Sequence, residues 1–151
     1  SGINYKNVEI STIHIHGTLA NAPDNPLIFG YGDEIDEEYK VLENLNNATV
    51  LDFIKSIAYL NSPNYRELIR FIDSDYYQIL IMGHSCGVSD RTLLNTIFEH
   101  KNCCSIKPYY YQIDENNDNY SELIKNISRN FHNKALMRER VVNKTFTKRL
   151  E

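Results

Sequence analysis

A short apolar run followed at once by a glycine-bounded turn restricts the fold of this chain more than any other segment. Residues 78–82 read QILIM, which predicts a strand buried on both faces, as in a parallel sheet. The turn 83–87 follows, and Ser89 or Asp90 would cap a helix over residues 91–100. A strand, a turn and a helix in this order are typical of a βαβ unit.

The remaining periodic segments extend the same alternation of strands and helices. β-Branched and aromatic runs predict strands, and apolar residues at helical spacing predict helices. The strands are expected over 8–15 and 105–113, and the helices over 49–60, 63–72 and 120–131. We therefore expect one α/β domain over residues 1–151, a three-layer Rossmann-like fold with a mainly parallel sheet, ending in a basic tail over 134–151. Because three strands make a thin sheet, we expect flanking sequence or a partner chain to complete it.

The bulk properties predict a cytoplasmic protein. The 151 residues carry a formal net charge of -4, so nucleic acid is not an expected partner. No apolar run approaches the roughly 18 to 20 residues of a membrane span, and no signal peptide opens the chain. The three cysteines form neither an even disulfide set nor a zinc pattern. The chain begins at Ser1 and ends in Leu150 and Glu151, from which we expect it to be part of a longer protein.

Two histidine-glycine segments lie at the positions where α/β sheets bind their ligands. His16 and His84 each follow a predicted strand, and the carboxyl ends of parallel strands share one edge. Gly17 and Gly83 would allow a ligand to approach the backbone closely. The helix that starts near Asp90 offers N–H groups to an anion, although the Asp90 carboxylate would oppose a phosphate there. A nucleotide site is one interpretation, and sharp turns with glycines for steric reasons are the other.

The turn GHSCG also fits the nucleophile elbow of serine hydrolases. Ser85 would be the nucleophile, with Asp114 or Asp118 and then His132 following in the hydrolase order. A helix should begin at the elbow itself, whereas residues 88–90 intervene before the predicted cap. The hydrolase therefore ranks below the nucleotide site.

Other groups have simpler structural interpretations. His14, His16 and His84 with Asp33 or Asp36 offer metal-ligand chemistry, but strand histidines more often pack or form hydrogen bonds, so no metal site is predicted. Cys86 is expected to be a small buried turn residue, and the tyrosines 109–111 to be part of a strand. The basic side chains of the tail are expected on a solvated helix face; they are Arg138, Arg140, Lys144, Lys148 and Arg149.

The order of the motifs resembles the bacteriophage abortive-infection AbiH family. The motifs are HIHG, an IFGYGDE loop, FIKS, ILIMGHSCGVSD, IFEH and YYY, and the likeness runs from about residue 13 to about residue 131. Members of the family are typically longer, with an N-terminal part that precedes this segment. The resemblance implies a phage-defence protein.

AbiH proteins are in turn similar to the sirtuin-like domains of anti-phage systems, which implies NAD as the ligand. On that likeness, His16 would be catalytic, as a base acting on a ribose hydroxyl or on water. Gly83, His84 and Ser85 would line the adenine-ribose or phosphate side. The first glycine-rich βα turn of a sirtuin-type domain is not among these 151 residues.

The expected function is therefore a domain that binds a nicotinamide nucleotide, or that cleaves it like an NAD glycohydrolase in the full-length protein. The phage-derived trigger and self-association into a homo-oligomer are left open. The alternative is a non-catalytic sensing or interaction domain that recognises a partner through the loop 20–36 or the basic tail.

Overall fold

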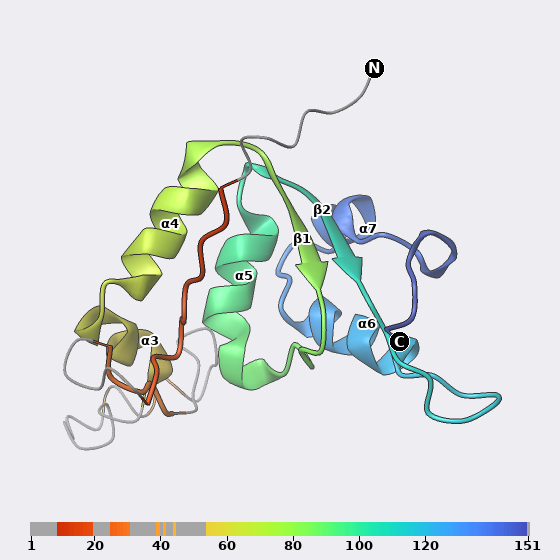
Figure 1. The fold of residues 1–151 in the computed structure, drawn as a ribbon, viewed down its shortest axis with the longest axis horizontal. Coiled ribbons are helices and arrows are strands. Elements are labelled where there is room, and N and C mark those ends of the chain that lie inside the picture. Colours follow the sequence, from red (N-terminus) through yellow and green to blue (C-terminus); the bar gives the residue numbers. More distant parts are fainter. Residues whose placement is uncertain are drawn as a thin grey trace.

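Two parallel strands joined by a helix form the centre of the computed structural model. It describes residues 9–19, 25–30, 39, 41, 44 and 54–150. Strand β1 (Tyr77–Ile81) pairs in parallel with β2 (Cys103–Pro108), and α5 (Arg91–Glu99) connects them (Figure 1). In the pairing register Ile79 lies opposite Ile106. The prediction of an α/β chain with parallel strands is confirmed.

The other helices lie to the two sides of this unit (Figure 1). They are α3 (Lys55–Ala58) with the 3-10 helix Tyr59–Asn61, α4 (Asn64–Ser74), α6 (Tyr120–Arg129), α7 (Lys134–Arg140) and the 3-10 helices Val88–Asp90 and Lys144–Phe146. The helices predicted over 63–72, 91–100 and 120–131 are confirmed. The start of the helix predicted over 49–60 lies outside the described residues. In the part of the chain that the structure describes, no helix has the length and apolarity to cross a membrane.

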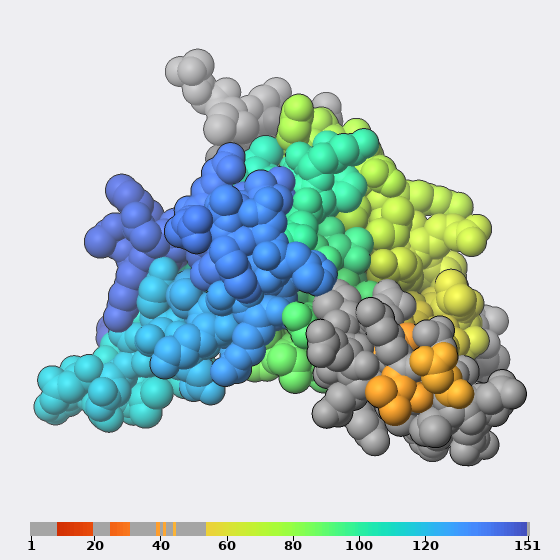
Figure 2. Space-filling view, turned by 180° about the vertical axis from the view of Figure 1, so that it is seen from behind, coloured from red at the N-terminus to blue at the C-terminus, as the bar shows by residue number. Residues whose placement is uncertain are grey.

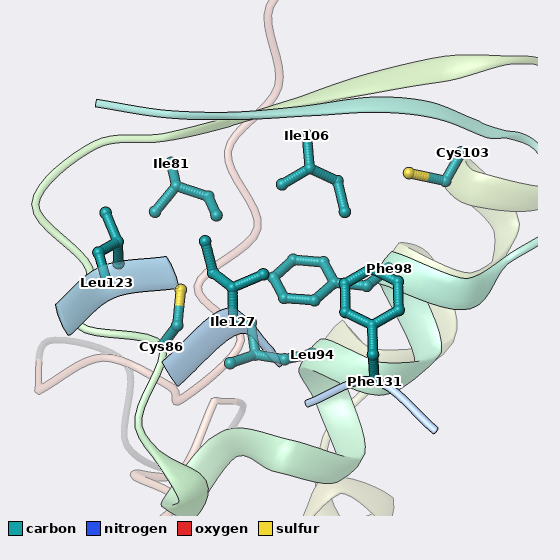
Figure 3. Packing of buried hydrophobic residues seen from close by; sticks show 9 residues of the cluster. All are labelled: Ile81, Cys86, Leu94, Phe98, Cys103, Ile106, Leu123, Ile127 and Phe131. Atoms are coloured by element: carbon teal, nitrogen blue, oxygen red, sulfur yellow. The ribbon is translucent and has the colours of Figure 1, made fainter. Parts of the chain in front are cut away.

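One apolar core lies between the sheet and the helices that follow it. Ile81 and Ile106 point from the strands toward Phe98 of α5 and Ile127 of α6 (Figure 3). Phe98, Ile106 and Ile127 are fully buried, and burial of each such side chain contributes about 1.5–3 kcal/mol. Helices α6 and α7 form the outer surface on this side, and the loop between β2 and α6 projects beyond it (Figure 2).

The opposite face of the sheet is open. Gln78 and Leu80 are exposed and alternate with the half-buried Tyr77 and Ile79 and the buried Ile81, and Leu80 is 51% exposed. The prediction that β1 is buried on both faces is therefore wrong. An apolar strand shows a preference for burial but not which element covers it, and α5, α6 and α7 all pack against the same cluster. A third layer stays a prediction.

The strand predicted over 8–15 is absent from the described residues 9–15. Ile10 is 88% exposed, and the segment runs between α4 and α5 without pairing to β1 (Figure 1). Its backbone is satisfied elsewhere: Asn64 of α4 donates to the His14 carbonyl at 2.7 Å, and the Ile28 N–H donates to the His16 carbonyl at 3.0 Å. These bonds compete with a sheet ladder, so β-branched composition alone overpredicted a strand.

The strand predicted over 105–113 ends early. β2 ends at Pro108, whose nitrogen carries no hydrogen to donate to a ladder. Beyond it, Tyr110 and Gln112 form only isolated bridges, so the tyrosines leave the sheet at its carboxyl end.

Candidate functional site

Three nitrogen-bearing side chains converge on the carboxylate of Asp90. Lys55 Nζ lies 2.5 Å and His16 Nε2 lies 3.2 Å from Asp90 Oδ1. His84 Nε2 lies 3.4 Å from Oδ2. We call these four residues the Asp90 cluster.

Asp90 stands at the N-cap position of α5, as predicted, but its side chain makes no capping hydrogen bond. The prediction of Asp90 as a capping residue is therefore correct in position and wrong in contacts. The Asp90 N–H instead bonds to the Gly87 carbonyl, which continues the 3-10 helix Val88–Asp90 before α5 begins. This geometry leaves the carboxylate facing Lys55 and the two histidines.

His16 is positioned by the glycine that follows it. Gly17 has φ +78°, and a Cβ there would lie 2.1 Å from the Pro26 carbonyl oxygen. Only glycine fits a left-handed turn with the loop so close. The hydrogen bond from the Ile28 N–H to the His16 carbonyl holds the same loop against His16. The role of Gly17 in this structure is thus to hold His16 against the 25–30 loop.

His84 is oriented by the turn in which it lies. The Cys86 N–H donates to His84 Nδ1 at 2.9 Å, so the ring proton of the neutral form sits on Nε2, the atom that faces Asp90. Cys86 is buried and adopts φ +54°, an uncommon conformation for a residue with a side chain. Asn130, the C-cap residue of α6, donates to the Cys86 carbonyl at 2.9 Å and fixes this conformation. Cys86 is thus a buried structural residue, as predicted.

Lys55 of α3 belongs to the Asp90 cluster, and Tyr59, the first residue of the following 3-10 helix, contacts His16 of the cluster. The Tyr59 ring stacks on His16 with centroids 6.3 Å apart, and the Tyr59 hydroxyl lies 3.4 Å from His16 Nε2. No pattern in the sequence indicated a role for either residue. Lys55 lies in the FIKS motif of the family resemblance, but a lysine at the start of a helix is ordinarily a solvated residue.

Charge is distributed unevenly over the cluster. The hydrogen bond from His84, and then Lys55, hold the pKa of Asp90 well below its usual range. The Asp90 carboxylate raises the pKa of His84, while the Cys86 amide at Nδ1 favours the neutral ring. Burial, and then the Lys55 ammonium, lower the pKa of His16 below 6.5. At neutral pH the cluster therefore holds an ionised carboxylate, an ammonium group and a neutral His16 that can accept a proton.

A cavity of about 130 Å³ adjoins His84, which is part of both the cavity and the Asp90 cluster. The turn residues Gly83, His84 and Ser85 line it together with Tyr109 and Tyr111 beyond β2. A face of α6 supplies the remaining wall, through Asn119, Glu122, Leu123 and Asn126. We call it the α6 cavity. The structure thus brings Gly83, His84 and Ser85 onto one cavity, and joins His16 and Asp90 to His84.

The predicted serine triad is not assembled. The ring of His132 contacts Asn95 at 3.0 Å and Glu99 at 3.6 Å. Asp118 pairs with Lys144 at 2.6 Å, and Asp114 accepts hydrogen bonds within its own loop. Each proposed partner of Ser85 is thus engaged in another interaction.

The tail is bound to the domain more tightly than a solvated face would be. Arg140 donates to the carbonyls of Phe98 and His100 at 2.6 and 2.9 Å, where α5 ends. The prediction of a purely solvated basic face is wrong for Arg140, whereas Lys144 is exposed and pairs at the surface with Asp118. Among the described residues no group of three histidine, cysteine or acidic side chains could hold a metal ion; Asp33 and Asp36 lie outside them.

A family model described as "Bacteriophage abortive infection AbiH" matches residues 2–112, well over half of the chain. The chain belongs to the AbiH family. The AbiH match contains every member of the Asp90 cluster, whereas the α6 wall of the cavity follows it in sequence. No curated protein and no solved structure matches the chain.

Proposed function

We propose that this AbiH domain binds a nicotinamide nucleotide at the Asp90 cluster, and that the full-length protein cleaves it during abortive infection. The observation that carries the proposal is the meeting of His16 and His84, far apart in sequence, at one carboxylate beyond the carboxyl end of β1. That edge of a parallel sheet is where α/β proteins bind nucleotides. A Rossmann-like sheet in the complete protein is part of the same proposal.

The charges of the cluster suit hydrolysis of an N-glycosidic bond. The ribose gains positive charge as the bond to nicotinamide breaks, and the ionised Asp90 would stabilise that charge. Neutral His16 would take a proton from water as the water oxygen bonds to the ribose carbon. Nicotinamide leaves with the electron pair of the broken bond as a neutral molecule. The Lys55 ammonium adds positive charge that offsets Asp90 and favours the phosphates of the nucleotide.

The test is release of nicotinamide from NAD by the purified full-length protein, with and without extract of phage-infected cells. His16→Gln keeps a hydrogen-bonding group near the Nε2 position but removes the base, and should slow release by about 100-fold or more. His132→Gln is the matched control, because His132 is an exposed histidine bound to Glu99 outside the cluster. Unchanged NAD with the wild-type protein under both conditions would contradict catalysis, as would equal rates for His16→Gln and the control.

A second function, a non-catalytic interaction domain, is favoured by the open face of the sheet. Leu80 and Met82 are 51% and 60% exposed on or just beyond β1. A phage protein or another subunit would bury them without using the Asp90 cluster. In that case Leu80→Lys would abolish recovery of a partner from infected cells, and His16→Gln would leave it unchanged.

A further inference from the structure

The α6 cavity adjoins the Asp90 cluster at His84, but its other lining residues are not members of that cluster. We propose that it is a ribonucleoside subsite, in which Glu122 accepts hydrogen bonds from the ribose hydroxyls and the base stacks on the ring of Tyr111. The proposal rests on the proposed function, because it assigns to this cavity the adenosine half of the nicotinamide nucleotide.

The size of the cavity restricts what it can hold. At about 130 Å³ it is smaller than the 300–1,000 Å³ of typical ligand pockets, so it takes one moiety and not a whole dinucleotide. A sugar ring fits this description, with the attached base lying at the mouth. Gly83 keeps one side open, since a Cβ at that position would meet nothing within 4 Å.

Polar groups enter the cavity from one face of α6. Asn119, Glu122 and Asn126 are spaced three and four residues apart, which places them on one side of the helix. An ionised carboxylate only accepts hydrogen bonds, so a ligand that binds to Glu122 must donate them. Vicinal hydroxyls of a ribose are such donors, and an acidic side chain is a recurrent ribose partner in nucleotide folds.

The walls are held in place before any ligand arrives. Asn126 donates to the Ser85 carbonyl at 2.9 Å, which fastens the glycine-bounded turn to α6. Asn119 accepts from the Tyr111 N–H at 2.8 Å and donates its own N–H to the Tyr111 carbonyl at 3.2 Å. Because both walls are tied to the same helix, binding would cost little reorganisation.

The two tyrosines of the cavity differ in what their rings can do. Lys107 Nζ lies 5.5 Å from the centroid of the Tyr109 ring and covers one of its faces. Tyr111 is 53% exposed, and its ring has no aromatic or cationic partner among the described residues. A flat base would stack on Tyr111 at the mouth of the cavity.

The same groups exclude a phosphate from the cavity. Of the described residues that line it, only His84 can carry positive charge, and Glu122 carries negative charge. A phosphate on the ribose would face the Glu122 carboxylate at close range and be repelled. The cavity therefore selects an unphosphorylated ribose, and NAD over NADP.

Calorimetric titration of residues 1–151 and of the full-length protein with adenosine, 2′-deoxyadenosine and adenosine 2′-phosphate tests the subsite. Adenosine should bind best, and Glu122→Gln should weaken it about tenfold by removing a charge-assisted bond. The same substitution should leave 2′-deoxyadenosine nearly unchanged and improve binding of the 2′-phosphate. Glu115→Gln, an exposed acid of the neighbouring loop, is the control and should change nothing.

Titration with NAD separates the two proposals. If NAD binds and perturbs the imidazole signal of His16, but adenosine affinity is absent or insensitive to Glu122, the subsite is overturned and the proposed function stands. If adenosine binds with the expected dependence on Glu122 and NAD is neither bound nor cleaved, the subsite is supported and the nicotinamide assignment fails. If neither ligand binds, both are wrong. Thermal melting of Glu122→Gln, expected to match the wild type because Glu122 is exposed, shows that the variant is folded.

Discussion

Lys55 and Asp90 form an ion pair with 2.5 Å between Nζ and Oδ1, and only 12% and 11% of the two side chains are exposed. The pair lies between two histidines that contact the same carboxylate. Removal of one partner would leave the other charge in a site largely closed to water. The stability of the domain should therefore depend on the groups that would also perform its chemistry.

The substitution Lys55→Met tests this dependence. It keeps the apolar stem but removes the ammonium group, so Asp90 loses its shortest contact, and we expect a loss of about 1–3 kcal/mol in the free energy of unfolding. Lys125→Met, at an exposed position of α6, should change stability by less than about 0.5 kcal/mol. Urea unfolding measures both, and equal effects of the two substitutions would show that the pair contributes nothing.

The histidines of the cluster predict a pH dependence with two limbs. The pKa of His16 is lowered, so the unfolded chain binds more protons below pH 6.5 and stability is lost as pH falls through that range. The pKa of His84 is raised, so the folded chain holds more protons above pH 6.5 and stability is lost as pH rises. The contribution of the two groups together should be greatest near pH 6.5.

Melting temperatures of the wild type and of histidine variants, measured between pH 5 and pH 10 in steps of about one pH unit, separate the acid limb from the alkaline limb. His84→Asn retains an acceptor near the Nδ1 position for the Cys86 amide and should flatten the alkaline limb. His16→Gln should flatten the acid limb. Parallel curves for the wild type and both variants would mean that neither histidine is coupled to Asp90.

Two glycines with nearly equal φ angles provide a matched pair of substitutions. Gly17→Ala places a Cβ 2.1 Å from the Pro26 carbonyl oxygen, whereas Gly83→Ala meets no atom within 4 Å. Both have φ above +70°, so each should lose about 1–2 kcal/mol from the left-handed backbone. Gly17→Ala should lose clearly more and should displace His16 from Asp90. Equal losses in thermal unfolding would show that the 25–30 loop yields to the new methyl group.

Local patterns in the sequence predicted much of the fold. The apolar run before Gly83 indicated β1, and amphipathic spacing indicated α4, α5 and α6. The strand over 8–15 failed, because side-chain bonds such as that from Asn64 to His14 cannot be read from β-branched composition. The open face at Leu80 was missed for a related reason: a sequence does not state which helices share a face.

Local patterns in the sequence also predicted one part of the candidate site and missed another. His16 and His84 were predicted from glycine-bounded turns, which are local signals. Lys55 and Tyr59 reach Asp90 and His16 because Tyr59 packs in one buried cluster with Leu93 of α5, and no local pattern indicates that contact. Glu122 and Tyr111 line one cavity only because α6 packs beside the turn 83–87, so the sequence alone does not reveal the cavity.

The most direct measurement of the central proposal is an NMR titration of the histidine rings of residues 1–151 with NAD. The chain has five histidines, so His100 and His132, which pair with acidic residues outside the cluster, are internal controls. We predict that the signals of His16 and His84 shift together and saturate at one NAD concentration below about 1 mM, and that Asp90→Asn abolishes the effect. Rings of His16 and His84 that do not respond to NAD, or that respond no more than those of His100 and His132, would contradict it.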